Sequence, residues 1–278
     1  MKKICFRIPI LLFAFGCLCS CMQEKSPGET NTTYIHPDYL DPYRPQIHYS
    51  RDTGWLSDPN GLYYLEGEWH MMFQGFSNRE GKYVGTNWDH AVSKDLLHWK
   101  HLPTVLQGGN QVSYYSGCAV VDQGVVWAFY TTHYMAKHPS TPNRNTISIA
   151  RSEDNGKTWT YGDHHPIVNP QFPHERDPSV FWHEESKRWI MATAGTGHIR
   201  FYSSENLSDW TFESEALPYP SWECPDLTSM KVEETGEEKI LLITSTNGGV
   251  VNSTHGTCYH VGTFDAVSYT HLRAHETT

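Results

Sequence analysis

Three carboxylates in this chain each stand one or two residues before a proline and just before a segment that reads as a strand. Asp58 precedes Pro59, Asp177 precedes Pro178, and Glu223 stands two residues before Pro225. Proline disfavours the helical region for the residue before it, and the Asn-Gly that follows Pro59 favours a tight turn. Taken singly, each acid is a turn residue or one half of a surface ion pair.

Brought together, three such carboxylates suit glycoside hydrolysis. A retaining enzyme needs a carboxylate nucleophile and a carboxylic acid about 5–5.5 Å apart. A third carboxylate can hydrogen-bond sugar hydroxyls and stabilise the oxocarbenium-like transition state. Like charges held close resist joint ionisation, and this effect can raise the pKa of the acid into a useful range. The chemistry therefore depends on a fold that gathers the three acids.

A repeat in the sequence predicts such a fold. A serine, an acid, a turn and a tryptophan recur in Ser93–Trp99, Ser152–Trp159 and Ser203–Trp210, and each copy predicts a hairpin with a polar tip. A pair of strands precedes each copy and appears a fourth time. The pairs are Gly61–Leu65 with Trp69–Phe73, Ala119–Val121 with Val125–Tyr130, Ser179–Trp182 with Arg188–Ala192, and Leu227–Val232 with Lys239–Thr244. Units of about four strands every 50–60 residues or so are typical of β-propeller blades.

The three acids fall at one register of this repeat. Asp58, Asp177 and Glu223 precede the first strands of units one, three and four, whereas unit two has Tyr115-Ser116-Gly-Cys118 there. The first strand of each blade lines the axis of a propeller, so we expect the acids to meet at one funnel. A β-sandwich would not give so long a period, and no βαβ alternation indicates a parallel sheet.

These residues resemble a known family. Trp55–Gly61, Arg176-Asp-Pro178 and Glu223-Cys224 resemble the three signatures of glycoside hydrolase family 32, the invertase, inulinase and levanase family. Further similar segments are His70–Gln74, Trp88–Trp99, Tyr115–Val121, Phe181–Trp189 and Gly262–Asp265, so the resemblance covers about residues 45–265. It implies an all-β, five-bladed β-propeller catalytic domain that hydrolyses β-fructofuranosyl bonds with retention and needs no cofactor or metal.

The resemblance also implies roles for individual residues. By position, Asp58 is the nucleophile, Asp177 the transition-state stabiliser and Glu223 the general acid/base. The positions that match contacts to the fructosyl unit are Ser57, Gln74, Tyr83, Tyr115, Ser116 and Arg176. Trp88 is expected either in the same pocket or buried in its blade.

Several positions depart from the family pattern. Ser57 replaces a usual Asn, Tyr83 a usual Trp, Tyr115 a usual Phe and Asp89 a usual Gly. Ser57 lacks an amide that would bind a fructose hydroxyl, and Asp89 would add negative charge near the cleft, so specificity or activity can differ. We expect an incomplete propeller of about four blades over residues 43–265, without the fifth blade and the C-terminal β-sandwich of the family.

The N-terminus is typical of a targeting segment. Lys2, Lys3 and Arg7 are followed by an apolar run from Ile8 to Leu18, which is too short to span a bilayer. Leu18-Cys-Ser-Cys21 resembles a bacterial lipobox. We therefore predict a lipoprotein signal peptide over residues 1–20, acylation of Cys21 and a flexible tether over residues 21–42, with an ordinary secretory signal as the alternative.

Charge and cysteine content limit the partners. Residues 1–20 hold three basic and no acidic residues, so their removal takes the net charge from −10 to −13, which disfavours nucleic acid and anionic membrane surfaces. Cys118, Cys224 and Cys258 match no disulfide framework or zinc motif and are expected as small buried residues. Residues 266–278 continue no blade pattern and are interpreted as non-native sequence or a disordered tail.

The sequence thus predicts an exo-acting fructan β-fructosidase that acts on levan, inulin or sucrose. We expect a bacterial cell-envelope location through a lipid anchor, on the outer surface or the periplasmic face, with secretion as the alternative. Two other functions remain open, namely an endo-levanase or invertase and a non-catalytic fructan-binding surface lipoprotein. The presence of all three acids argues against the binding protein.

Overall fold

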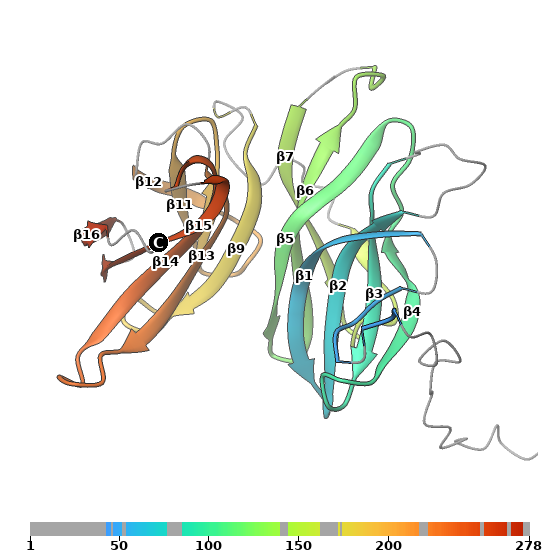
Figure 1. Cartoon of the computed structure of the whole chain (residues 1–278), viewed down its shortest axis with the longest axis horizontal. Helices are drawn as coiled ribbons and strands as arrows, with labels where there is room; N and C mark the ends of the chain where they lie inside the picture. Colours follow the sequence, from blue (N-terminus) through green and yellow to red (C-terminus); the bar gives the residue numbers. More distant parts are fainter. Residues whose placement is uncertain are drawn as a thin grey trace, which may run out of the picture. The chain divides into compact units, whose positions relative to one another are not determined.

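The computed structural model describes residues 43–45, 47–51, 54–76, 85–139, 144–161, 172, 174–216, 222–250, 253–265 and 268–274. These residues form four antiparallel sheets of four strands, each a meander in chain order (Figure 1). None of them builds a helix with the length and hydrophobicity that crossing a bilayer requires. The predicted signal peptide and Cys21 lie outside the described residues, as does all of the tether.

We call the four sheets blades 1 to 4. Blade 1 contains β1 (Trp55–Leu65), β2 (Glu68–Phe76), β3 (Asn87–Ser93) and β4 (Trp99–Leu106). Blade 2 contains β5 (Val112–Asp122), β6 (Val125–Tyr134), β7 (Arg144–Ser152) and β8 (Thr160–Tyr161). Blade 3 contains β9 (Arg176–His183), β10 (Arg188–Ala194), β11 (Ile199–Ser204) and β12 (Thr211–Ala216). Blade 4 contains β13 (Trp222–Lys231), β14 (Glu238–Val250), β15 (Ser253–Phe264) and β16 (Tyr269–Ala274).

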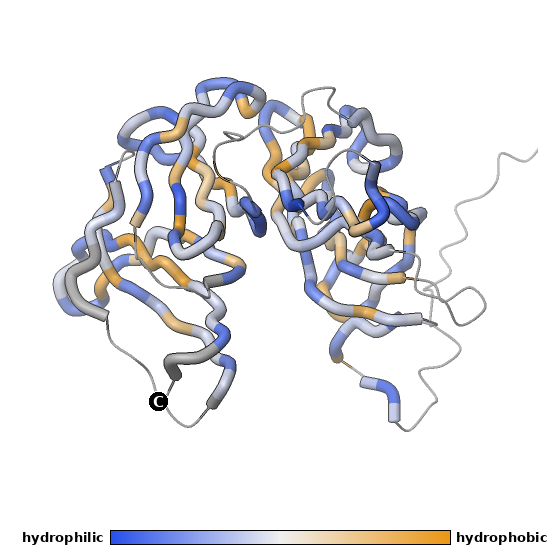
Figure 2. The backbone as a smooth tube through the Cα atoms, turned by 90° about the horizontal axis from the view of Figure 1, so that it is seen from above, coloured by the Kyte–Doolittle hydropathy of each residue, from blue (hydrophilic) through white to orange (hydrophobic). Residues whose placement is uncertain are grey.

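The predicted propeller arrangement of about four blades is confirmed, and its cores lie between neighbouring blades. Because successive strand residues point to opposite faces, a middle strand can serve two cores. On β6, Ala128 packs toward blade 1 and Phe129 toward blade 3. On β10, Ile190 packs toward blade 4 and Met191 toward blade 2. Apolar stretches accordingly recur along the strands in Figure 2.

The four predicted strand pairs are also confirmed. Tyr63 pairs with His70 across β1 and β2, and Leu227 pairs with Leu242 across β13 and β14. The first strands begin earlier than the sequence indicated, however. Asp58 and Asp177 lie inside β1 and β9 and not in turns before them, and Glu223 lies inside β13.

The serine-to-tryptophan repeat forms the hairpin tips between the third and fourth strands of three blades. In blade 1, Ser93 Oγ accepts the Leu96 N–H at 2.9 Å, and Trp99 Nε1 donates to the Leu96 carbonyl at 3.0 Å. In blade 2, Ser152 Oγ accepts the Gly156 N–H at 2.8 Å, and Trp159 donates to the Gly156 carbonyl at 3.1 Å.

The third copy of this repeat corrects the predicted alignment. Ser204, and not Ser203, accepts the Leu207 N–H at 2.9 Å, and Trp210 donates to the Leu207 carbonyl at 3.0 Å. Asn206 takes the place of the acid, because its Oδ1 accepts the N–H groups of the turn. An amide oxygen can accept these hydrogen bonds as a carboxylate does.

The end of the chain also differs from expectation. Tyr269–Ala274 form β16, which pairs with β15 as the fourth strand of blade 4. Tyr269 is 6% exposed, packs in the core between blades 3 and 4, and donates from its hydroxyl to the His260 carbonyl at 2.7 Å. Residues 269–274 therefore continue the blade pattern. That residues 266–278 are non-native remains a prediction.

Candidate active site

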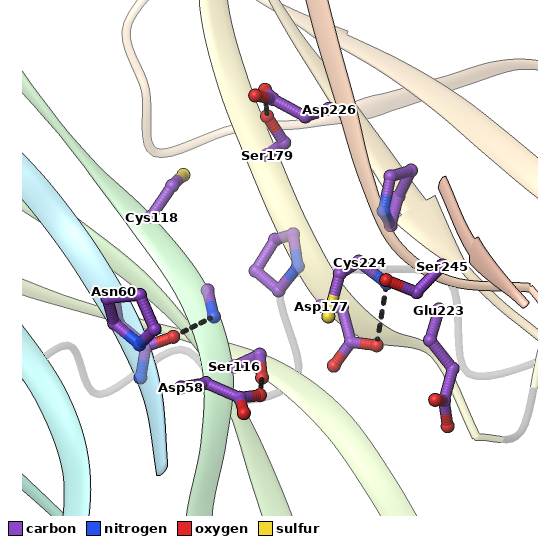
Figure 3. Close-up of a pocket in the computed structure, with 14 residues that line it drawn as sticks. Asp58, Asn60, Ser116, Cys118, Asp177, Ser179, Glu223, Cys224, Asp226 and Ser245 are labelled. Atoms are coloured by element: carbon purple, nitrogen blue, oxygen red, sulfur yellow. Dashed lines mark hydrogen bonds between the residues drawn. The ribbon is translucent and has the colours of Figure 1, made fainter. Parts of the chain in front are cut away.

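Two adjoining cavities lie at the first strands of the blades. The axial cavity, of about 490 Å³, follows β1, β5, β9 and β13; apart from the three acids it is lined by Asn60, Cys118, Ser179, Asp226 and Ser245 (Figure 3). The mouth cavity, of about 400 Å³, is lined by the same acids and by Gln74, Tyr115, Ser116, His133, Asn145, His174, Arg176 and Cys224. Asp58, Asp177 and Glu223 line both, so the three acids meet where the cavities join.

Irregularities in the first strands present the acids to these cavities. The pairing register shifts at Asp177 and Pro178 in blade 3, and at Cys224 and Pro225 in blade 4. Asp177 and Cys224 have positive φ angles, of 55° and 47°. A β-bulge bends its strand and redirects a side chain, and proline fits there because it has no N–H to donate.

Asp58 is held by three donors from blades 1 and 2. Its Oδ2 accepts hydrogen bonds from Ser116 Oγ at 2.5 Å and from Gln74 Nε2 at 3.3 Å. Its Oδ1 accepts from Ser57 Oγ at 2.9 Å. Gln74 also donates to Ser116 Oγ at 2.8 Å. Because Gln74 and Ser116 are buried, the network fixes the carboxylate against the wall of the cavity.

Asp177 is the most enclosed of the three acids and is 7% exposed. Its backbone N–H donates to Thr131 Oγ1 at 2.8 Å, and its Oδ2 accepts from the Cys224 N–H at 3.1 Å. Burial raises the pKa of Asp177 to about 6. The Cys224 N–H and the Arg176 guanidinium oppose this rise, whereas the negative charges of Glu223 and Asp58 add to it.

Glu223 is more open, and Arg176 links it to Asp177. The Glu223 side chain is 40% exposed, and its Oε1 lies 3.5 Å from Arg176 Nη2. Arg176 Nε lies 3.5 Å from Asp177 Oδ2. The three acids therefore have different environments: one fixed by donors, one buried, and one accessible to solvent for proton exchange. Such differences separate the roles of paired carboxylates.

Of the six predicted contact positions, five lie in the described residues. Gln74, Tyr115, Ser116 and Arg176 line the mouth cavity, and Ser57 is bonded to Asp58. Tyr83 lies outside the described residues. Trp88, for which two placements were open, is fully buried in the core between blades 1 and 2 and donates to the Tyr115 carbonyl at 2.8 Å.

Two expectations about neighbouring residues were wrong. Asp89 does not add charge to the cleft: it is 1% exposed and pairs with Arg51 at 3.0 Å, and it lines neither cavity. Cys224 is exposed at the site and is not a core residue. Although the residue as a whole is exposed, the surrounding site desolvates its sulfur and, together with the nearby Asp177 and Asp58, raises the pKa of the Cys224 thiol to about 12, so it is not poised as a thiolate nucleophile.

Sequence reasoning missed a polar wall of the mouth cavity. The Tyr115 and His133 rings stack at 5.0 Å, and His133 Nδ1 lies 2.7 Å from Asn145 Oδ1. Because the amide oxygen only accepts, His133 Nδ1 is the donor of this hydrogen bond. Ser113, His133 and Asn145 pair across β5, β6 and β7, so this wall leads outward from the acids over blade 2.

No group of three His, Cys, Asp or Glu side chains that could hold a metal occurs within the described ranges. The two cavities are lined instead by four carboxylates, of which Asp58, Asp177 and Glu223 line both, by one guanidinium and by other hydrogen-bonding groups.

Comparisons with known proteins show which family this chain is similar to. Residues 48–277 match the sequence model of the "Glycosyl hydrolases family 32 N-terminal domain". The chain is 36% identical over 242 residues to a levanase of Bacillus subtilis, with 83% of this chain and 36% of that protein covered. It is 35% identical over 272 residues to an extracellular exo-inulinase of Aspergillus awamori, with 84% and 50% covered.

Two solved structures have a fold similar to that of this chain. The exo-inulinase of Aspergillus awamori superposes with a TM-score of 0.74 at 31% identity, covering 86% of this chain and 54% of that one. The β-fructofuranosidase of Schwanniomyces occidentalis in complex with fructosyl-erythritol also gives 0.74, at 28% identity, covering 84% and 48%. The chain thus spans about a third to a half of the length of these curated relatives.

Proposed function

This chain belongs to glycosyl hydrolase family 32, and from that premise we propose that its acid-lined site hydrolyses β-fructofuranosidic bonds with retention of configuration. One observation carries the proposal: Asp58, Asp177 and Glu223 come from the first strands of three blades, line the same two cavities and have three different environments. This arrangement supplies a fixed nucleophile, a buried carboxylate and an accessible proton donor.

The proposed reaction has two steps. A carboxylate oxygen of Asp58 attacks the anomeric carbon of the fructosyl unit while Glu223 gives its proton to the departing glycosidic oxygen. Glu223 then takes a proton from water, the water oxygen attacks the same carbon, and the Asp58 carboxylate leaves. Two displacements on one carbon retain its configuration.

Asp177 and Arg176 are proposed to hold the fructosyl unit between these steps. Asp177 is placed to accept hydrogen bonds from sugar hydroxyls, and an ionised carboxylate there would stabilise positive charge that develops on the ring. Arg176 contacts both Asp177 and Glu223. Its positive charge can therefore offset the repulsion between these two carboxylates.

We favour fructans over sucrose as substrates, with cleavage at the chain end. The mouth cavity continues from the acids over blade 2, where His133 and Asn145 supply an imidazole and an amide for hydroxyls of a further sugar unit. Relatives named levanase and exo-inulinase support this choice, whereas another relative, at 31% identity, is named invertase.

Product analysis of the full-length protein tests the proposal. With inulin and levan we expect free fructose as the sole early product, formed as the β-anomer, and faster release per mole of enzyme than from sucrose. Early oligosaccharides would favour an endo-acting enzyme, and a faster reaction with sucrose would favour an invertase. Fructan binding without any release would favour the non-catalytic surface lipoprotein.

The cell location is proposed from the N-terminal segment and from the extracellular relatives. An acyl chain on Cys21 would hold the enzyme at the cell envelope, where polymeric fructans are accessible. Labelled palmitate should enter the wild-type protein and should not enter the Cys21→Ser variant. Equal labelling of both would refute the lipid anchor at this residue and leave secretion as the alternative.

A further inference from the structure

We infer that Glu175 is a positioning residue for Asp177 and Arg176, through an ion pair with Arg200 buried behind the mouth cavity. This inference rests on the proposed function, because it assigns a task to a residue that touches no substrate. Glu175 directly precedes Arg176, yet it lines neither cavity. Its side chain is fully buried behind the segment that carries the two cavity residues.

The contacts of Glu175 anchor it to the second and third strands of blade 3. Its Oε1 accepts from Arg200 Nη1 at 2.6 Å, and its Oε2 accepts from the Thr193 hydroxyl. Thr193 lies on β10 and Arg200 on β11, and the two residues pair directly across these strands. Because both carboxylate oxygens are held, the Glu175 side chain has one orientation relative to the blade.

Arg200 is itself fixed on several sides. Its guanidinium lies 4.2 Å from the centre of the Phe172 ring, and its Nε lies 3.3 Å from Glu215 Oε2. Gly195 leaves the space that this group occupies. A Cβ at position 195 would overlap Arg200 Nη1 and would approach Glu175 Oε1 to 3.0 Å. The ion pair is therefore built into a space that only glycine leaves free.

The backbone on either side of Glu175 shows why an anchor is needed. His174 has a φ of 69° and Asp177 a φ of 55°, so two non-glycine residues within four positions adopt the left-handed region. Each such residue is unfavourable and persists only where its surroundings over-determine it. Glu175 lies between them, so its buried ion pair opposes relaxation of the segment that presents Arg176 and Asp177.

Blade 1 offers a matched comparison. Asp89 on β3 pairs with Arg51 at 3.0 Å, both side chains are buried, and a Cβ at Gly75 would overlap Arg51. In both blades, a residue before the first strand pairs with a residue on the third strand. In blade 1 the arginine comes before the first strand and the carboxylate is on the third strand, whereas in blade 3 the two are exchanged. Arg51 is seven residues before Asp58, whereas Glu175 is two before Asp177. The blade 1 pair should therefore affect stability without a comparable effect on the acids.

The test compares Glu175→Gln with Asp89→Asn in the full-length protein, with kcat, KM and Tm measured on the same fructan. Each variant removes one buried carboxylate charge, so both should lower Tm. Glu175→Gln should also lower kcat/KM by about 10- to 100-fold at temperatures where it is folded, because small displacements of positioned groups have effects of this size. Asp89→Asn should keep kcat/KM within about threefold.

Glu175→Gln with a lower Tm and an unchanged kcat/KM would overturn the inference, as would equal losses of kcat/KM in both variants. If the wild-type protein released no fructose, the proposed function would fail separately. Fructan affinity would then decide the matter, because a displaced Arg176 and Asp177 should weaken binding in Glu175→Gln alone. Equal affinity of Glu175→Gln and the wild type would overturn the positioning role.

Discussion

Replacing Asp58 with asparagine should lower fructose release from levan or inulin by about 10⁴-fold or more, as losses of a covalent nucleophile do elsewhere. Asparagine has the size of aspartate and keeps an oxygen that can accept from Ser116 and Gln74. The substitution removes the negative charge of the proposed nucleophile and leaves the packing in place. Tm should therefore change by no more than a few degrees, as measured by thermal unfolding beside the activity assay.

A matched control removes a different carboxylate from the same cavity. Asp226 follows Glu223 on β13, lines the axial cavity and accepts from Ser179 Oγ at 2.8 Å, but it does not line the mouth cavity. Asp226→Asn should keep fructose release within about threefold. Undiminished turnover by Asp58→Asn would end the assignment of the nucleophile. An equal loss in Asp226→Asn would show that the effect comes from the charge of the cavity in general.

The blade repeat could be predicted because its evidence is local. Serine, a turn and tryptophan make hydrogen bonds within a few residues of each other, and two of the three copies align as predicted. The third copy failed at Ser203-Ser204, where either serine fits the pattern. The structure selects Ser204, because this register buries Leu207 completely in the core between blades 2 and 3. Burial between blades is a tertiary property that the local pattern does not contain.

The acids were predicted at the correct register but in the wrong backbone setting. Proline beside an acid indicates that regular pairing is interrupted, and both a turn and a β-bulge satisfy that condition. Only the pairing partners distinguish them. Asp177 and Cys224 reach positive φ inside paired strands, where Thr131 of blade 2 accepts the Asp177 N–H. That contact joins positions 46 residues apart, so no short segment encodes it.

The polar wall of the mouth cavity gave no sequence signal at all. His133 and Asn145 are twelve residues apart and belong to no motif. They meet because β6 and β7 pair in one register, and His133 reaches the cavity because its ring stacks on Tyr115. Glu175 was missed for a different reason. A charged residue beside Arg176 is expected at the surface. Glu175 can be buried because it forms an ion pair with Arg200, which is distant in the sequence.

Replacing Asp177 with asparagine should remove activity and at the same time stabilise the fold at neutral pH. The pKa of Asp177 is about 6 in the folded protein, against 3.8 for an unperturbed group. The folded state therefore binds the proton more tightly than the unfolded state. The stability that this proton contributes is present below about pH 3.8 and is lost as pH rises through about 6. Above both values the ionised, buried Asp177 destabilises the fold by on the order of 3 kcal/mol.

Asparagine removes that titration and can still accept the Cys224 N–H through its amide oxygen. Tm of Asp177→Asn should thus exceed that of the wild type by several degrees at pH 7.5, since 1 kcal/mol corresponds to about 2–4 °C for a domain of this size. The difference should shrink between pH 6 and pH 4 and vanish below, when Asp177 is neutral in the wild type. A difference that is constant with pH, or largest in acid, would contradict both the raised pKa and its cause. A stabilised, inactive variant would show that burial of this charge serves catalysis at the expense of stability.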